Sequence, residues 1–356
     1  MSSTVWKNVQ PFELTLSATK QVQLPLRHGG LGLTSVSNHS SSAFISSLSN
    51  AAPNASHHLK HAIALYNTKI NSADAVTFET VTSSPPQQYH LSGKMEDNSF
   101  QTLLINSTVC TRARLRAVSA SNANAWLRAI PCIHNNLALE PEEMQVLLKW
   151  WLFPQLTVNV PFAQMHLIQI ATTSLRVVLE VTSLHGTISP GLDFSRPADM
   201  LVPNWSLSNP AAFDLALSAA KIPACLEPSG VARSEGKRPD GISMVPWKEG
   251  KLLVWDATCR DTLASSHLST AERGPGLLAA EAESEKRKKY SSLGVKYFFV
   301  PVSCESLGVF GAETLSFLKG PWPSSAPNHG DSQSYQFLLQ CLSVATLSSF
   351  DCLDGF

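Results

Sequence analysis

The chain has 356 residues, of which 44% are hydrophobic and only 15% charged, so it can bury a sizeable core. Its 27 basic and 27 acidic residues cancel, which excludes a global attraction for nucleic acid and leaves only local basic clusters for contact with a polyanion. No apolar run approaches the length of a membrane span, and the first residues lack a signal-peptide pattern, so we expect an intracellular protein without membrane contact, either nuclear or cytoplasmic. The seven cysteines form no CxxC pair, which is typical of reduced thiols rather than of disulfides or a zinc site.

A glycine-rich segment lies near the start of the chain, LPLRHGGLGL at 24–33. Three glycines between leucines predict a tight structural turn, which leads into a helix around 42–45. A phosphate-binding loop is the alternative interpretation. It is disfavoured because no lysine follows the glycines and no strand pattern precedes them.

The N-terminal half is predicted to be helical. Apolar residues recur at helical spacing in four segments, at 57–66, 99–118, 121–129 and 140–151. We expect Ser121 to act as the N-cap of the third helix. The fourth begins with a proline and glutamates, as helices commonly do, and its Trp150 and Trp151 are expected in the core rather than as a platform for stacked bases.

One arrangement of aspartates occurs twice in the C-terminal half. The sequence RPAD, ending at Asp199, is followed by Asp214, and RPDG, containing Asp240, is followed by Asp256. Each copy predicts a turn that carries an aspartate, then a strand, a short connection and a second strand that carries another. We interpret the first pair as structural or vestigial, because no helix rich in Glu and Lys follows it.

The second copy predicts a β-hairpin, with strands at 242–245 and 252–257 and a turn at 246–250. Because side chains alternate along a strand, Val254, Asp256 and Thr258 share one face, and Trp255 and Ala257 share the other.

An aspartate buried on such a strand is costly unless it is paired or binds a cation. Two carboxylates from neighbouring strands can hold a hydrated Mg²⁺ ion, which takes one or two protein carboxylates together with water and substrate phosphate. We therefore predict Asp240 and Asp256 as catalytic residues and metal ligands. A bound metal could polarise a phosphodiester and activate the attacking water.

A charged segment at 281–290 is predicted to be a helix with the spacing AExxKxxKY. That spacing brings Glu283, Lys286 and Lys289 or Tyr290 toward one face, where the glutamate and the two lysines are candidate catalytic residues and a lysine could offset charge in the transition state. An ordinary solvated helix with i,i+4 ion pairs would look the same. A strand at 295–302 and a helix near 313–318 follow it, an order that fits a small α/β nuclease core.

The array RPDG, WDAT, AExxKxxKY and ESLGVFG resembles the C-terminal restriction-like endonuclease domain of retroelement (retrotransposon) reverse transcriptase proteins, which belongs to the PD-(D/E)xK nuclease class. LPLRHGGLGL and RARLRAVSASNANAWLRAIP resemble the region after the polymerase core in the same proteins. The resemblance implies that Asp240 and Asp256 bind metal, that Thr258 stands where the class usually has its lysine, and that Lys286 or Lys289 replaces it. The YxDD motif is absent from the chain, so no polymerase activity is expected.

Together these features predict a mixed α+β and α/β protein, with a helical N-terminal half followed by a small α/β restriction-endonuclease-like domain. The predicted parts begin with a helical region at 1–152 and a linker at 153–192, where relatives carry a zinc knuckle that is lost here. A partial first motif at 193–230 precedes the nuclease-like domain at 231–320, and a linker with a tail occupies 321–356. The predicted function is a Mg²⁺-dependent DNA endonuclease, active or degenerate. The alternatives are a non-catalytic remnant that binds DNA or RNA through Lys286 to Lys289, and a helical scaffold without a site.

Overall fold

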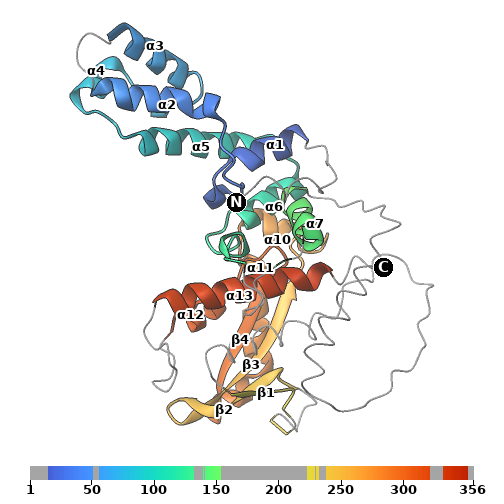
Figure 1. The fold of residues 1–356 in the computed structure, drawn as a ribbon. Helices are drawn as coiled ribbons and strands as arrows, with labels where there is room; N and C mark the ends of the chain where they lie inside the picture. The colour runs from blue at the N-terminus through green and yellow to red at the C-terminus, as the bar shows by residue number, and fades with distance from the viewer. Residues whose placement is uncertain are drawn as a thin grey trace, which may run out of the picture.

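The computed structural model of the protein describes residues 15–50, 56–131, 139, 141–153, 223–228, 230–231, 238–320 and 332–351. These residues form helices and one small four-stranded mixed sheet (Figure 1). Asp199 and Asp214 lie outside them, as does the segment predicted to have lost a zinc knuckle, apart from its first residue. Among the described helices, none combines the length and the apolar character that crossing a membrane requires.

Seven α-helices are described in the N-terminal half. They are α1 (Leu16–Gln23), α2 (Val36–Ser49), α3 (Ser56–Asn67), α4 (Phe78–Ser83), α5 (Gln88–Ile105), α6 (Val109–Val118) and α7 (Pro141–Leu152). Helices α2 to α5 form a lobe at one end of the molecule, and α6 and α7 lie between that lobe and the sheet (Figure 1). The lobe has a core of its own, which includes Ile45, Tyr66 and Met95.

The predicted helices at 57–66 and 140–151 are confirmed as α3 and α7. The segment 99–118 contains parts of two helices, because the Thr108 side chain accepts the N–H of Thr111 at 3.3 Å and starts α6 as a new helix. The helix predicted at 121–129 is wrong. Turns and the short 3-10 helix η5 (Trp126–Arg128) occupy it, and the Asn124 amide donates to the Leu26 carbonyl oxygen.

The glycine-rich segment is a structural turn, as predicted, and it leads into α2. Gly29 has a φ of 71°, in the left-handed region that favours glycine, and a Cβ there would lie 2.3 Å from Val118 Cγ2. Its carbonyl oxygen accepts hydrogen bonds from Gln21 Nε2 and from Trp151 Nε1, both at 2.8 Å. Trp151 is buried, as predicted, and ties this turn to α7.

The sheet consists of β1 (Ala224–Leu226), β2 (Gly241–Lys248), β3 (Lys251–Arg260) and β4 (Phe298–Glu305), in that order. The first three strands are antiparallel neighbours, and β4 is parallel to β3. The predicted hairpin is confirmed, but its strands are longer than predicted and its turn is only two residues. Glu249 and Gly250 both have positive φ angles, of 53° and 73°, as the tightest hairpin turns require. Pro246 lies within β2, where the pairing register shifts on either side of it, because proline has no N–H to donate.

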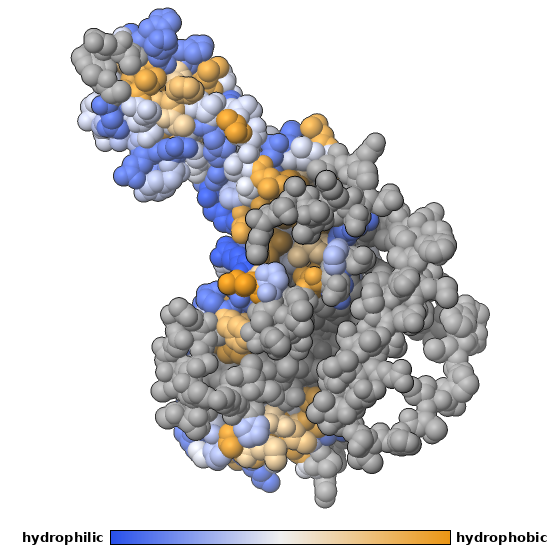
Figure 2. Space-filling view, in the orientation of Figure 1, coloured by the Kyte–Doolittle hydropathy of each residue, from blue (hydrophilic) through white to orange (hydrophobic). Residues whose placement is uncertain are grey.

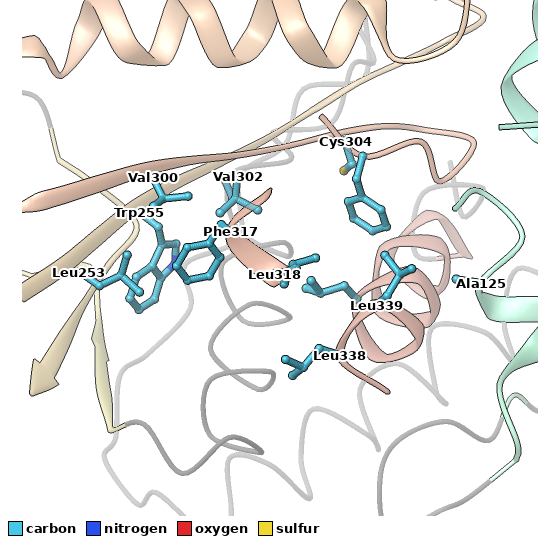
Figure 3. Packing of buried hydrophobic residues seen from close by; sticks show 13 residues of the cluster. Ala125, Leu253, Trp255, Val300, Val302, Cys304, Phe317, Leu318, Leu338 and Leu339 are labelled. Atoms are coloured by element: carbon cyan, nitrogen blue, oxygen red, sulfur yellow. The ribbon is translucent and has the colours of Figure 1, made fainter. Parts of the chain in front are cut away.

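The two faces of β3 differ as predicted. Leu253, Trp255 and Ala257 join a hydrophobic core with side chains of β4 and of the helices α12 (Ala312–Lys319) and α13 (Ser332–Asp351). Figure 3 shows the buried residues of the two strands facing those of the two helices. Val254, on the other face, packs with Tyr290 at the end of α11 (Leu277–Lys289). The sheet therefore lies between two layers of helix.

Helix α13 occupies most of the segment predicted as a linker and tail. Its apolar residues Leu338, Leu339 and Leu342 are buried in the core beneath the sheet. A second core cluster joins this helix to the N-terminal half, since Trp126 and Trp151 pack in the same cluster as Leu307, Val309 and Val344. Figure 2 shows a surface on which hydrophilic and hydrophobic residues alternate over the described parts of the N-terminal lobe.

Gly241 is predicted to be required for the hairpin. A Cβ at this position would lie 2.0 Å from Cζ2 of the fully buried Trp255 indole, which cannot move without disturbing the core. We expect Gly241→Ala to lower the free energy of unfolding by roughly 1–3 kcal/mol. Gly294→Ala is the matched control, because nothing lies within 4 Å of the added carbon. Chemical denaturation would measure both, and equal midpoints would contradict the close packing.

Candidate functional site

Asp240 and Asp256 lie close together at one end of the β2–β3 hairpin. Asp240 immediately precedes β2, whose first residue Gly241 pairs with Trp255, and the Asp240 N–H donates to the Trp255 carbonyl oxygen at 3.0 Å. Asp240 Oδ2 accepts the N–H of Ala257, the residue after Asp256, at 2.6 Å. The hairpin therefore brings together two carboxylates that are sixteen residues apart in the sequence.

The environment of Asp240 disfavours its charge. Burial, and after it the negative charge of Asp256, raise the pKa of Asp240 to about 6. The Ala257 N–H, which donates to Asp240 Oδ2 at 2.6 Å, opposes this rise, as do the charges of Lys286 and Lys289. The carboxyl group is thus held in place while remaining costly to ionise.

Lys286 completes the cluster from helix α11. Its ammonium forms an ion pair with Oδ2 of the buried Asp256 and donates to the Ala257 carbonyl oxygen at 3.4 Å. The Ala257 peptide therefore contacts Asp240 through its N–H and Lys286 through its carbonyl. The resemblance predicts a lysine at the position of Thr258. The lysine that contacts Asp256 is instead Lys286, which belongs to helix α11.

Of the other two predicted residues, Glu283 lies away from the cluster and Lys289 lies near it. Both carboxylate oxygens of Glu283 face the start of α12, where they accept the N–H groups of Glu313 at 3.1 Å and Thr314 at 3.0 Å. Glu283 is buried and serves as a cap for that helix, away from the aspartate pair. Lys289 Nζ lies 4.6 Å from the centre of the Tyr290 ring, so it is near the cluster without an ion pair to Asp256 like that of Lys286.

The cluster also contains Tyr290, which is not among the predicted catalytic residues. Its hydroxyl lies 3.0 Å from Asp256 Oδ1 and 2.9 Å from the Arg238 carbonyl oxygen. The sequence signal was the final residue of the AExxKxxKY spacing, which lies seven residues, or two helical turns, after Glu283. Tyr290 is the C-cap residue of α11, so the end of that helix is bonded directly to Asp256.

A second buried glutamate fixes the other end of α11. Glu305, at the end of β4, accepts the Leu278 N–H at 3.2 Å. Burial raises the pKa of Glu305 to about 7, although N–H groups at the start of α11 oppose the rise. Glu305 therefore anchors the first turn of the helix, and Tyr290 anchors the last.

The donor atoms of the aspartate pair suit a hard cation. Among the described residues, no group of three or more His, Cys, Asp or Glu side chains could hold a metal. Two carboxylates are nonetheless what Mg²⁺ takes from a protein when water and phosphate supply its remaining ligands. A metal here would also relieve the repulsion that raises the Asp240 pKa. Asp240 and Asp256 therefore fit Mg²⁺, and a soft-metal site is disfavoured by the same donor atoms.

No protein-family model matches the chain, and no curated protein matches it. The relationship to retroelement nucleases stays a prediction.

Asp240→Asn is expected to stabilise the metal-free protein. A carboxyl whose pKa is raised in the folded state favours folding when protonated and loses that contribution as the pH rises through about 6. The amide oxygen of asparagine can still accept the Ala257 N–H. We expect a gain in unfolding free energy on the order of 1–3 kcal/mol at pH 8 and almost none at pH 4. Denaturation at both pH values measures it, and a less stable variant at pH 8 would show that Asp240 has a structural role.

Glu283→Gln is expected to destabilise the fold by roughly 1.5–3 kcal/mol, because a buried acceptor of two backbone N–H groups is replaced by an amide that can accept only through its oxygen. Glu285→Gln, two residues on in the same helix, is the matched control. Its carboxylate is exposed and pairs with Arg260, so its loss should cost less than about 1 kcal/mol. Thermal denaturation would compare the two, and similar losses would contradict the capping role.

Proposed function

We propose that the protein is a Mg²⁺-dependent DNA endonuclease that hydrolyses phosphodiesters at Asp240, Asp256 and Lys286. The observation that carries this proposal is the ion pair of Lys286 with the buried Asp256, whose neighbour Ala257 donates its N–H to the Asp240 carboxylate. Two carboxylates and one ammonium on a single face are the groups needed to bind a metal and to offset charge on a phosphodiester. A fold that needed only a stable hairpin would gain nothing from burying two acids together.

The topology supports a restriction-endonuclease-like core. Three antiparallel strands lead through the short helix α10 (Leu268–Arg273) into helix α11, and the chain then returns through β4, which is parallel to β3. This crossover places α11 against the face that carries the aspartates, and α12 and α13 against the opposite face. The sequence resemblance and the observed strand order favour the same nuclease class.

Each residue has a distinct proposed role. Asp240 and Asp256 would hold Mg²⁺, which when bound polarises the phosphodiester and lowers the pKa of water. Asp240 is kept in orientation by the Ala257 N–H. Lys286 neutralises Asp256 in the free protein, and beside a substrate its ammonium can orient water or stabilise negative charge on a phosphate oxygen.

DNA is the proposed partner, bound through basic residues beside the site. Residues 286–304 include no aspartate or glutamate and five cations, which are Lys286, Arg287, Lys288, Lys289 and Lys296. The first four occupy the last turn of α11, where they also favour the helix dipole. Lys286 and Lys289, whose charges act on Asp240, could hold the phosphates on either side of the bond to be cut, with an affinity that falls as salt rises.

A non-catalytic nucleic-acid-binding domain is the second candidate function. The Lys286–Asp256 ion pair and the Tyr290 hydroxyl already satisfy Asp256 without a metal. If the Lys286–Asp256 ion pair does not open to admit a metal, the same basic residues would bind DNA or RNA without cutting it.

A plasmid-nicking assay separates the two. We expect the wild-type protein to nick supercoiled DNA with Mg²⁺ and not with EDTA, and both Asp256→Asn and Lys286→Met to lose at least about 100-fold in rate. Glu285→Gln, on the same helix but paired with Arg260, should retain wild-type activity. Wild-type protein that binds DNA without nicking it would favour the second function, and an Asp256→Asn variant that nicks normally would refute the proposed site.

A further inference from the structure

The Tyr290 hydroxyl lies between the two segments that carry the aspartates. One neighbour is Oδ1 of Asp256 on β3, and the other is the carbonyl oxygen of Arg238, two residues before Asp240. Both neighbours are acceptors, while the hydroxyl has a single hydrogen to donate. The charged carboxylate is the stronger acceptor, so the hydrogen is directed mainly at Asp256.

The surroundings hold this hydroxyl in place. A tyrosine hydroxyl carries its hydrogen at neutral pH, so it donates to the Asp256 carboxylate, which can only accept. The side chain is 2% exposed, and its ring centre lies 5.0 Å from that of Phe299. Val254 and Leu293 complete the apolar cluster around the ring. Little freedom is left for the hydroxyl to move away.

The contacts of Asp256 consequently divide between its two oxygens. Oδ1 receives the Tyr290 hydroxyl, and Oδ2 receives the Lys286 ammonium. A carboxylate held by only one of them could rotate about its terminal bond, because that torsion is broad. With both contacts, Oδ2 is directed to the side from which Lys286 approaches.

We propose that Tyr290 is a positioning residue, which fixes the rotation of the Asp256 carboxylate so that Oδ2 faces Lys286 and the metal. This inference rests on the proposed function for its metal and adds a residue that touches neither metal nor substrate. Hydrogen-bonding partners of metal ligands commonly contribute 10- to 100-fold to affinity or activity.

The test compares Tyr290→Phe with Tyr297→Phe. Both variants lose one hydroxyl from the same apolar cluster, but only Tyr290 is bonded to Asp256. We expect Tyr290→Phe to raise the Mg²⁺ concentration for half-maximal nicking by about 10- to 100-fold while the KM for DNA stays unchanged. Tyr297→Phe should leave both values as in the wild type. An unchanged Mg²⁺ requirement in Tyr290→Phe, with active wild-type protein, would overturn the inference and leave the proposed function standing.

A second measurement needs neither metal nor cleavage. The ¹³C signal of the Asp256 carboxyl carbon in metal-free protein should shift in Tyr290→Phe and stay in place in Tyr297→Phe. An unshifted signal in Tyr290→Phe would overturn the positioning role even if the protein cuts no DNA. A shifted signal with inactive wild-type protein would support the positioning of Asp256 and refute the nuclease.

Discussion

The buried ion pair of Lys286 and Asp256 is the contact on which the geometry of the site depends. It links a helix to a central strand, so α11 must lie within reach of a lysine side chain over β3. Two buried glutamates set that position. Glu305 at the end of β4 anchors the first turn of α11, and Glu283 within α11 anchors the first turn of α12. β4, α11 and α12 are therefore connected by carboxylates that lie at helix N-termini, where the helix dipole favours negative charge.

The opposite face of the sheet provides the stability that this acidic face lacks. Trp255, next to Asp256 in the sequence, is completely buried with side chains of α12 and α13, and its ring closes against Gly241 next to Asp240. Hydrophobic burial on one face thus fixes the hairpin register that brings the two carboxylates together. The raised pKa of Asp240 shows that its burial, and after it the nearby charge of Asp256, has a cost in the metal-free protein. Groups kept in an unfavourable environment by a rigid scaffold are typical of functional sites.

Sequence patterns predicted the parts of this site that depend on local periodicity. The alternation along β3 assigned Trp255 and Asp256 to opposite faces, and the predicted hairpin brings Asp240 near Asp256. Helical spacing grouped Glu283 with Lys286, but it could not distinguish their partners. The direction in which each of these side chains points depends on where α12 begins, and the position of α12 depends on packing between elements distant in the chain.

Other features were missed because tertiary contacts outweigh local preference. The bulge at Pro246 lengthened β2 beyond its predicted end, and the packing of α13 under the sheet gave a helix where proline-rich sequence before it indicated a tail. The helix expected after Ser121 is replaced by turns whose Asn124 amide bonds to Leu26. Tyr290 was visible in the sequence as part of a spacing, but its role as a hydrogen-bond donor depends on the tertiary packing that places the end of α11 beside Asp256.

The central claim is that Asp240 and Asp256 form one metal site, and metal binding itself tests it most directly. Electron paramagnetic resonance can count Mn²⁺ ions bound to the purified protein and their displacement by Mg²⁺. The account predicts one ion on the wild type, displaced by Mg²⁺, and none on Asp240→Asn or Asp256→Asn, whereas Glu285→Gln binds normally. Wild-type protein that binds no Mn²⁺, or aspartate variants that bind it as the wild type does, would contradict the account.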